Sequence, residues 1–357
     1  MQAAYIQRLQ KIEAVLEAWL PTEPSQEWIK NVFGTLTEKD IPAGLVQSLT
    51  RPGKDLLERG GKRWRPLLMT LICESLGGKE EALPLVPLVE FPHNGSLIHD
   101  DIEDNSDERR GKPAIHILYG LDTGVNSGSF LYFLPLACLA AWEAPDSRKL
   151  QVMQCWAEHL RRIHLGQAMD IYWHRDFSSL PSEALYEQMC RLKTGVLARL
   201  AAELGVYAAA NRVTFPPEQS EHALRTAFGE AAESLGVGFQ ILDDVKNLTT
   251  GNPGKKRGDD IVEGKKSLPI ILYLQEDPRR IEFVKRCFSA ARAGGTAVPE
   301  VEELIGELDA TGVIERARKR GYQLIHNAIE TYKKEQSPLI QDEEAHHLLI
   351  EMVSLLG

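Results

Sequence analysis

The chain has no excess of positive charge and no paired cysteines, and each absence excludes a class of protein. The formal net charge is −10 at pH 7, whereas a surface that binds nucleic acid is usually basic. We therefore expect no nucleic-acid partner. The five cysteines are scattered, with no CxxC pair and no histidines at zinc-binding spacing. This pattern predicts reduced cysteines and a cytoplasmic protein.

Long apolar segments are also missing. The longest apolar run, residues 130–142, is interrupted by Pro135 and is shorter than the roughly 20 residues that a membrane-spanning helix needs. Residues 1–20 form a mixed amphipathic pattern that includes Glu13 and Glu17, and they lack the apolar core of a signal peptide. We expect no transmembrane segment and no signal peptide.

Patterns typical of β-strands are absent as well. The chain shows no sustained alternation of apolar and polar residues bounded by hairpin turns. Stretches rich in Ala, Leu, Glu, Lys and Gln are separated by Pro, Gly and Asp clusters, and no repeat or low-complexity linker is evident. The sequence therefore predicts an all-α protein of roughly a dozen helices, folded as a single domain over residues 1–357.

Residues 90–116 place a dense group of acids beside a basic pair, Arg109 and Arg110. No glycine or proline interrupts residues 96–110, so we expect a helix that ends at the arginines, where cations suit the helix dipole. Asp100 and Asp104 are four residues apart and share one face of that helix. Two such carboxylates require a compensating charge, and Mg²⁺ prefers oxygen ligands of this kind. A solvated acidic face is the alternative interpretation.

A second acidic motif follows at residues 238–248. Asp243 and Asp244 end an apolar helical run, and Asn247 lies four residues after Asp243. Two such motifs suggest two helices that face each other across a cavity and hold metal ions between them. A further acid, Asp170, lies on the apolar helix predicted over residues 150–173, where a carboxylate is costly unless it is paired or bound to metal.

Basic residues cluster in a glycine-containing segment, residues 60–66, which reads GGKRWRP. The two glycines allow close backbone approach, and arginine binds phosphate through a planar fork. We interpret the segment as a diphosphate site; the alternative is a basic loop that makes surface ion pairs. Pro66 suits the first turn of the helix that follows.

Two further segments show breaks in otherwise helical patterns. Lys193, Thr194 and Gly195 interrupt a helix over residues 186–204, and a glycine there costs about 1 kcal/mol relative to alanine. This predicts a local break that directs Lys193 and Thr194 into a cavity, unless the glycine serves packing alone. Residues 251–269 are rich in glycine and cations, which predicts a mobile loop that closes over a phosphate or is simply solvated.

Taken together, these motifs resemble those of the trans-prenyltransferases, or isoprenyl diphosphate synthases, in order from about residue 60 to residue 269. The segments GGKRWRP, DDIED, RRG, GQAMD, KTG, FQILDDVKN and GKKSLP match the family's signature positions. The long runs HNGSLIHDDIEDNSDERRGKPAIHILYG and GQAMDIYW are most similar to the eukaryote-type geranylgeranyl diphosphate synthases. The resemblance implies the isoprenoid synthase fold, a helical bundle around a central apolar cavity.

The resemblance also implies roles for individual residues. The implied Mg²⁺ ligands, for three ions per active site, are Asp100, Asp104, Asp170 and Asp243, supported by Asp244. The implied ligands of isopentenyl diphosphate are Lys62, Arg65, His93 and Arg110. The implied ligands of the allylic diphosphate are Arg109, Lys193, Lys255 and, in the closing loop, Lys265. Thr194 and Gln240 would line the reacting centre, and Asn247 replaces the aspartate that usually ends the second motif, as a weaker, neutral ligand.

The implied reaction condenses isopentenyl diphosphate with dimethylallyl, geranyl or farnesyl diphosphate and releases diphosphate. Family members carry bulky aromatic residues before the first motif when growth stops at farnesyl length, whereas Gly95 and Ser96 are small. A lower cavity floor formed by Tyr132, Phe133 and His164 would then limit the product to C20, geranylgeranyl diphosphate. By resemblance, we also expect a homodimer.

Four other interpretations are less consistent with the motifs. A longer-chain polyprenyl diphosphate synthase would share the chemistry and differ only in the floor. A regulatory subunit of a heteromeric prenyl synthase usually loses acids from one motif, whereas both Asp-Asp pairs are intact here. A class I terpene cyclase lacks the isopentenyl diphosphate site, and a purely structural helical protein would leave the acidic and basic motifs unexplained.

Overall fold

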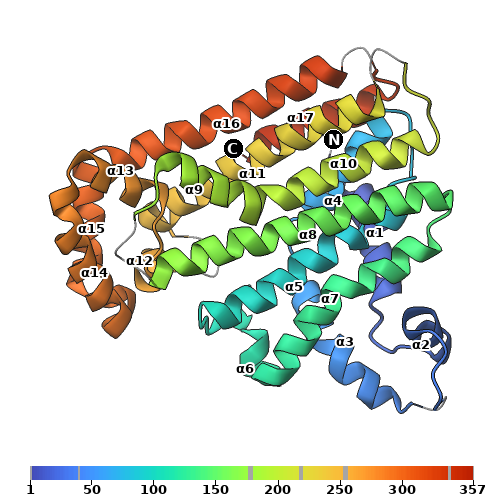
Figure 1. The fold of residues 1–357 in the computed structure, drawn as a ribbon, viewed down its shortest axis with the longest axis horizontal. Coiled ribbons are helices and arrows are strands. Elements are labelled where there is room, and N and C mark those ends of the chain that lie inside the picture. The colour runs from blue at the N-terminus through green and yellow to red at the C-terminus, as the bar shows by residue number, and fades with distance from the viewer. Residues whose placement is uncertain are drawn as a thin grey trace. The chain divides into compact units, whose positions relative to one another are not determined.

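The computed structural model describes residues 2–38, 41–175, 180–216, 220–251, 256–336 and 339–356. This part of the chain is almost entirely helical, which confirms the predicted all-α class (Figure 1). It forms two compact units. The first comprises residues 1–157, 200–226 and 336–349, and the second residues 158–199, 227–335 and 350–357. The expectation of one domain over the whole chain stays a prediction.

The first unit contains the N-terminal half of the chain, with its helices joined by short turns. Its elements are α1 (Gln2–Trp19), α2 (Gln26–Phe33), α3 (Ala43–Glu58), α4 (Trp64–Ser75), the 3₁₀ turn Leu83–Leu85, α5 (Pro87–Glu103), α6 (Ile115–Tyr119) and α7 (Leu121–Ala141). The described elements run to α17, more than the roughly dozen helices predicted by apolar periodicity. One reason is Gly120, whose φ of 93° separates α6 from α7.

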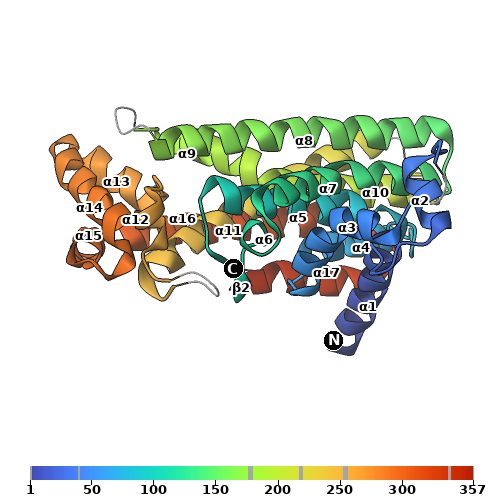
Figure 2. The same ribbon diagram turned by 90° about the horizontal axis from the view of Figure 1, so that it is seen from below.

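Helices α5 and α7 pack side by side in the first unit (Figure 2). Two glycines bring their backbones together: a Cβ atom at Gly95 would lie 2.7 Å from the carbonyl oxygen of Gly128. Helix α5 begins with Pro87, a residue whose fixed φ suits the first helical turn. The α5–α7 contact therefore fixes the helix that carries the first acidic motif.

The end of α5 differs from the prediction of a helix that continues to Arg109 and Arg110. Asn105 takes a left-handed φ of 54°, a conformation that asparagine tolerates better than most residues. The N–H of Asn105 donates to the carbonyl of Ile102 at 3.3 Å, and that of Ser106 donates to the carbonyl of Asp101 at 2.8 Å. This pair of bonds is a Schellman motif, which ends the helix. The chain then reverses through a short antiparallel hairpin, β1 (Glu108–Arg109) and β2 (Lys112–Pro113).

The second unit contains most of the C-terminal half. The elements that lie in it wholly or in part are α8 (Asp146–Arg175), α9 (Glu183–Cys190), a π-helical turn (Arg191–Gly195), α10 (Val196–Ala210), α11 (Glu221–Thr249), α12 (Asp259–Glu263), α13 (Leu268–Glu276), the 3₁₀ turn Pro278–Arg280, α14 (Ile281–Gly294), the 3₁₀ turn Gly295–Ala297, α15 (Pro299–Ala310), α16 (Val313–Gln336) and α17 (Glu343–Leu356). The predicted break in the helix over residues 186–204 is confirmed, because the π-helical turn covers Lys193, Thr194 and Gly195.

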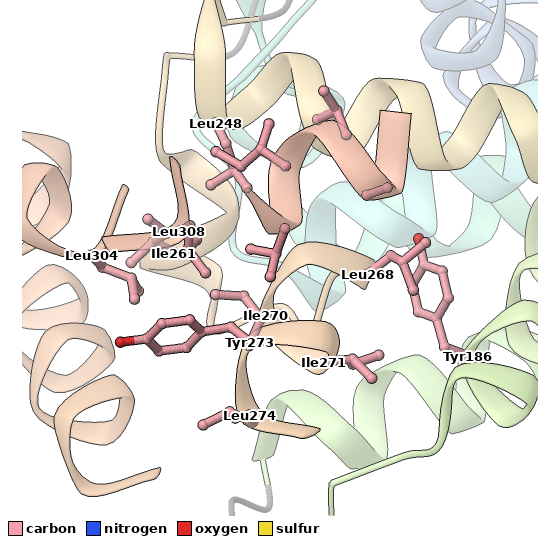
Figure 3. Packing of buried hydrophobic residues seen from close by; sticks show 14 of the residues in the cluster. Tyr186, Leu248, Ile261, Leu268, Ile270, Ile271, Tyr273, Leu274, Leu304 and Leu308 are labelled. Atoms are coloured by element: carbon pink, nitrogen blue, oxygen red, sulfur yellow. The ribbon is translucent and has the colours of Figure 1, made fainter. Parts of the chain in front are cut away.

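An apolar core holds α11 to α15 together in the second unit. Figure 3 shows Leu248, Ile261, Ile270 and Leu304, from four different helices, pointing toward one another. All four are at most 4 % exposed, and complete burial of such a side chain contributes about 1.5–3 kcal/mol. This core anchors the C-terminal end of α11, which carries the second acidic motif.

Helix α7 is the single helix in the described ranges that is long and apolar enough to cross a membrane. Half of its most apolar window is buried within the protein, and Pro135 lies inside it. Its contacts with α5 and α3 explain its apolar character as that of a core helix. The five cysteines are all buried and free, as expected of reduced residues.

Candidate active site

The first acidic motif occupies the last turn of α5. The backbone N–H of Asp104 donates to the carbonyl of Asp100 at 2.8 Å, so their carboxylates lie one helical turn apart, as predicted. Both residues are partly exposed, whereas Asp101 between them is fully buried. The motif thus has two partly exposed aspartates and one that is fully buried.

The buried Asp101 pairs with Arg109 of the hairpin. Nε and Nη2 of Arg109 donate to Asp101 Oδ1 at 2.8 and 2.5 Å, and Nη2 lies 3.6 Å from Asp100 Oδ2. Burial raises the pKa of Asp101, and the hydrogen bonds from Arg109 oppose that rise. Arg109, predicted to bind the allylic diphosphate, therefore also holds the hairpin against α5.

A second arginine, Arg59, holds the hairpin from the end of α3. Its Nη1 donates to the carbonyls of Arg109 and Pro113 at 3.1 and 2.9 Å, and its Nε donates to Asp55 at 2.9 Å. Sequence analysis missed Arg59. Its spacing of four residues from Asp55, which allows an ion pair on one helix face, was the available signal.

Three of the four predicted isopentenyl diphosphate ligands lie together in the first unit. Nη1 of Arg65 donates to Nε2 of His93 at 3.4 Å, and each of these side chains is close enough to Arg110 for the charges to interact. Gly61 gives Arg110 room, because a Cβ atom there would lie 3.2 Å from its Nη2. The fourth residue, Lys62, is exposed.

These cations are short of negative charge. Burial and, to a smaller extent, neighbouring arginines lower the pKa of both Arg65 and Arg110 to about 10, although Glu90 opposes the fall. Burial, followed by Arg65 and Arg110, also lowers the pKa of His93 well below its usual value. Among the described residues, Nε of Arg65 is buried with no hydrogen-bond partner. A bound anion would satisfy this N–H and relieve the repulsion between the cations.

Beneath this cluster lies one buried ion pair, between Arg63 and Glu90. Nη1 of Arg63 is 3.0 Å from Glu90 Oε1, its Nη2 donates to the carbonyl of Leu57 at 2.6 Å, and its Nε donates to Glu13 at 2.8 Å. Asn94 donates to the same Glu90 oxygen at 3.1 Å. Arg63 is thus a structural member of the basic motif, for which sequence analysis gave no role.

In the second unit, Asp170 on α8 lies against two basic side chains. Its Oδ2 lies 2.5 Å from Lys193 Nζ, and its Oδ1 lies 2.8 Å from Nε2 of His174, one turn further along. Burial alone would raise the pKa of Asp170, but Lys193 and His174 outweigh it and hold the pKa well below its usual value. The carboxylate is therefore charged, and His174 is a partner that sequence analysis missed.

The π-helical turn is linked to the second acidic motif through side chains. Thr194 Oγ1 donates to Gln240 Oε1 at 2.8 Å, and Gln240 Nε2 donates to Asp244 Oδ1 at 2.9 Å. Asp244 also accepts the hydroxyl of Tyr186 at 2.6 Å. Burial, together with the nearby Asp260, raises the pKa of Asp244. Asp244 is a buried member of this network, which agrees with its predicted supporting role.

The two ends of the second acidic motif differ in exposure. Asp243 is exposed, whereas the side chain of Asn247, expected as a weak metal ligand, is fully buried. Asn247 Oδ1 accepts the backbone N–H of Asp260 at 3.2 Å, and the Asn247 carbonyl accepts the N–H of Gly258 at 3.0 Å. Asn247 therefore connects α11 to α12 and does not face solvent as a ligand.

The predicted loop over residues 251–269 contains a short helix that sequence analysis did not predict. Residues 259–263 form α12, and Lys266 is buried, with its Nζ donating to the carbonyl of Trp173. Lys265 pairs with Glu263 and lies 3.7 Å from Asp260. The predicted ligand Lys255 lies outside the described residues.

Comparisons with known proteins point to one family. The family model for polyprenyl synthetases matches residues 46–307. The chain belongs to the polyprenyl synthetase family. This membership confirms the predicted enzyme class, a trans-prenyltransferase.

Several relatives of this polyprenyl synthetase are geranylgeranyl pyrophosphate synthases. The protein from the archaeon Geoglobus acetivorans is 31% identical over 323 residues, which cover 90% of this chain and 92% of that protein. A protein from the fungus Metarhizium robertsii is 31% identical over 325 residues, covering 90% and 91%. The solved structure from Geoglobus acetivorans has a TM-score of 0.74 at 26% identity and covers 98% of each chain. A decaprenyl diphosphate synthase from Rhodobacter capsulatus, 23% identical with a TM-score of 0.78 over 100% and 98% of the two chains, shares the fold.

The residues predicted to set product length differ in burial and lie on different helices of this polyprenyl synthetase. Gly95 faces α7 at the helix crossing described above, whereas Ser96 is half-buried and donates to the carbonyl of His93 at 2.8 Å. Tyr132 is buried, with its ring centroid 5.5 Å from that of His99. Phe133 is 67% exposed on the first unit, and His164 is exposed on the second, with Nδ1 2.7 Å from the carbonyl of Leu160. Their joint role as a floor stays a prediction.

The predicted metal ligands of the polyprenyl synthetase have the donor chemistry that Mg²⁺ requires. Mg²⁺ takes hard oxygen ligands and usually binds one or two carboxylates, completing its shell with water and phosphate. Asp100 and Asp104 offer two partly exposed carboxylates one turn apart, and Asp243 offers an exposed one. Asp170 is charged, although Lys193 and His174 already contact its oxygens. The aspartates of each unit therefore fit the ion.

Proposed function

We propose that this polyprenyl synthetase condenses isopentenyl diphosphate with an allylic diphosphate and releases geranylgeranyl diphosphate. The observation that carries the proposal is the cluster of Arg65, His93 and Arg110. Its two arginines are partly buried and repel each other, and one Arg65 N–H has no acceptor among the described residues. A diphosphate supplies the missing charge and oxygen acceptors, and arginine binds such groups through paired hydrogen bonds.

The remaining residues suit the second substrate, the allylic diphosphate. In the π-helical turn, Lys193 donates to Asp170 and Thr194 donates to Gln240, so the turn presents a cation and a hydroxyl from adjacent residues. Mg²⁺ held by the aspartates of either unit would supply positive charge that stabilises the departing diphosphate. The lysine side chains, with Arg109, would orient that group and share its charge as the carbon–oxygen bond breaks.

The condensation that follows requires no further co-reactant. The allylic carbon, once separated from its diphosphate, is attacked by the double bond of isopentenyl diphosphate, and a new carbon–carbon bond forms. A proton is then lost to the departed diphosphate. Apolar walls would exclude water, which otherwise captures the allylic cation.

The C20 product is supported by the relatives and by the residues before the first motif. The relatives from Geoglobus acetivorans and Metarhizium robertsii, which match about nine-tenths of the chain, are geranylgeranyl pyrophosphate synthases. Gly95 and Ser96 place no aromatic ring ahead of Asp100. Tyr132, a buried aromatic residue on α7, would limit growth beyond this length.

A product assay tests the proposal. Purified protein receives labelled isopentenyl diphosphate, Mg²⁺ and, in turn, dimethylallyl, geranyl or farnesyl diphosphate, and the extracted products are sized. We expect a C20 diphosphate. Products of C30 or longer would retain the enzyme class and reject the length, whereas no condensation with any primer would favour a regulatory subunit.

We also propose that the enzyme is a cytoplasmic homodimer. Five large apolar side chains are exposed on α6 and α7 of the first unit: Ile117, Leu118, Leu121, Val125 and Phe133. Exposed apolar side chains in this number on two consecutive helices favour a second chain as their cover. Sedimentation analysis should give a dimer for the wild type and a smaller species for Phe133→Glu.

A further inference from the structure

The π-helical turn Arg191–Gly195 decides where Lys193 and Thr194 point. Such turns are rare and occur mostly as single-turn features at functional sites. Here the turn directs Lys193 Nζ to Asp170 at 2.5 Å and Thr194 Oγ1 to Gln240 at 2.8 Å. A regular α-helix over the same residues would change both directions, because each residue would advance by a different angle. The surroundings of the turn must therefore favour the wider geometry.

Three glycines bring backbone directly against the turn. A Cβ atom at Gly166 of α8 would lie 2.4 Å from the backbone nitrogen of Lys193. On the other side, a Cβ atom at Gly195 would lie 2.7 Å from the carbonyl oxygen of Glu233, and one at Gly236 would lie 2.6 Å from Cα of Gly195. The turn is thus packed between α8 and α11, with backbone close to backbone at all three glycines.

One buried carboxylate, Glu233 of α11, faces arginines from three elements around the turn. Its oxygens lie 3.3 Å from Nη2 of Arg162 on α8, 3.5 Å from Nη1 of Arg191 in the turn, and 3.6 Å from Nη1 of Arg199 on α10. The Glu233 side chain is only 7% exposed. These distances exceed the usual 2.7–2.9 Å of a strong charged hydrogen bond, so the three arginines share the carboxylate. Glu233 consequently links the turn to α8, α10 and α11.

Nothing in the proposed chemistry requires Glu233 to touch a substrate. Its partners are the three guanidinium groups, and the residue that connects it to the substrate-binding side chains is Arg191, two residues before Lys193. Arg191 Nη1 also lies 3.5 Å from Ser234 Oγ, which adds a second contact between the turn and α11. The link from Glu233 to Lys193 therefore passes through the backbone of the π-helical turn.

We propose that Glu233 is a positioning residue that, through its ion pairs with Arg191, Arg162 and Arg199, holds the π-helical turn in the geometry that presents Lys193 and Thr194 to the allylic diphosphate. The inference rests on the proposed function, which assigns that substrate to Lys193 and Thr194. A misplacement of about 1 Å at a substrate contact can cost roughly a hundredfold in rate. Loss of the carboxylate should accordingly affect the allylic substrate far more than isopentenyl diphosphate.

The test compares Glu233→Gln with two matched variants. Glu233→Gln keeps size and hydrogen-bonding capacity and removes the charge, and Glu233→Asp keeps the charge. Glu187→Gln is the control, because Glu187 on the preceding helix α9 is only 13% exposed and its carboxylate forms an ion pair, at 2.6 Å, with Arg320 of α16 and not with the arginines around Glu233. For Glu233→Gln we expect kcat/KM for the allylic diphosphate to fall by about 10- to 100-fold, with KM for isopentenyl diphosphate unchanged within about twofold. Glu233→Asp should restore part of the loss, and Glu187→Gln should change neither constant.

A second measurement does not depend on activity. Amide hydrogen exchange of the peptide that covers residues 191–195 should be faster in Glu233→Gln than in the wild type and unchanged in Glu187→Gln. If Glu233→Gln does not fold, Arg191→Gln removes the link at a partly exposed residue and should give the same kinetic and exchange pattern. Unchanged exchange, equal losses for both substrates, or the same effect from Glu187→Gln would overturn the inference. A wild-type chain without activity would defeat the proposed function, while faster exchange in Glu233→Gln alone would still support the positioning role.

Discussion

Asn247 Oδ1 accepts the backbone N–H of Asp260 at 3.2 Å, which connects the end of the second acidic motif to α12. The Asn247 side chain is fully buried, and Asp260, also buried, is close enough to Asp244 to raise the pKa of that carboxyl. An aspartate at position 247 would therefore become the third carboxylate in one buried region. The neutral amide suits this position because it makes the hydrogen bond without adding charge.

We predict that Asn247→Asp destabilises the protein by about 2 kcal/mol at pH 7, on the order of the cost of a poorly satisfied buried polar group. The loss should shrink at lower pH, where the added carboxyl is protonated. Urea unfolding at pH 7 and pH 5 measures both effects. A variant as stable as the wild type that also needs less Mg²⁺ for activity would instead make position 247 a metal ligand.

Arg63 and Arg65, two residues apart, should respond differently to replacement. Arg63→Ala leaves Glu90 buried and unpaired, so we expect a loss of about 3–5 kcal/mol in unfolding free energy. Arg65→Ala removes a cation from a crowded cluster and should cost little stability. It should raise KM for isopentenyl diphosphate by at least tenfold, since a hydrogen bond to a charged group contributes about 1.5–3 kcal/mol. Unfolding curves and steady-state kinetics of both variants would contradict this assignment if the two effects were reversed.

His93 should make the protein less stable in mild acid. Burial, followed by Arg65 and Arg110, holds its pKa in the folded state well below the usual value of 6.5. As the pH falls below about 6.5, the unfolded state therefore binds the proton first, and stability decreases by up to about 1.4 kcal/mol per pH unit until the folded-state pKa is reached. Above about pH 7 the effect vanishes. His93→Gln should remove this component, which urea unfolding between pH 5 and 7.5 would reveal as a shallower slope.

Substitutions at Gly95 and at Ser96 should distinguish a role in helix packing from a role in control of product length. A Cβ atom at Gly95 would approach the Gly128 carbonyl oxygen to 2.7 Å, so Gly95→Ala should destabilise the protein by about 1–3 kcal/mol through overpacking. Ser96→Phe lies at a half-buried position and should leave a folded enzyme that makes mainly C15 product. Thermal unfolding and product sizing of both variants decide this. A shortened product from Gly95→Ala at unchanged stability would reject the packing role.

Removal of Tyr132 should lengthen the product. Tyr132 is buried on α7, and its replacement by alanine would open space where the chain is expected to end. We expect products longer than C20 from Tyr132→Ala and from His164→Ala, measured with farnesyl diphosphate as primer. Tyr322→Ala, at a tyrosine 48% exposed on α16, serves as the control and should still give C20. Unchanged C20 product from both test variants would place the floor elsewhere.

Local signals predicted several features of the fold and the site correctly. The glycine of the Lys193–Thr194–Gly195 segment predicted a break, and the structure has a π-helical turn there. The spacing of Asp100 and Asp104 predicted carboxylates one turn apart, which the backbone bond between them confirms. Each of these features depends on residues within a turn or two of one another, so neighbouring sequence contains enough information to predict it.

Features that depend on contacts between distant segments were missed. In the sequence, Glu90 and Glu233 resemble ordinary surface acids. The fold buries both of them and pairs Glu90 with Arg63 and Glu233 with three arginines. The helix end at Asn105 was missed because its signal is a single asparagine that takes a left-handed conformation, in an acidic run without glycine or proline. Helix α12, residues 259–263, was missed because the group that caps it is the side chain of Asn247, which lies on another helix and accepts the N–H of Asp260.

In the hairpin, the adjacent side chains of Arg109 and Arg110 contact different partners. Arg109 lies in β1 and turns to Asp101, whereas Arg110 has a φ of 53° and turns to the carbonyl of Leu56. The placement of both arginines therefore depends on the number of residues between Asn105 and Arg110. Insertion of one residue there would move Arg109 into the position of Arg110 and would move Arg110 one position beyond it. A chain with the same motifs and a longer interval between them would therefore no longer place its charges correctly.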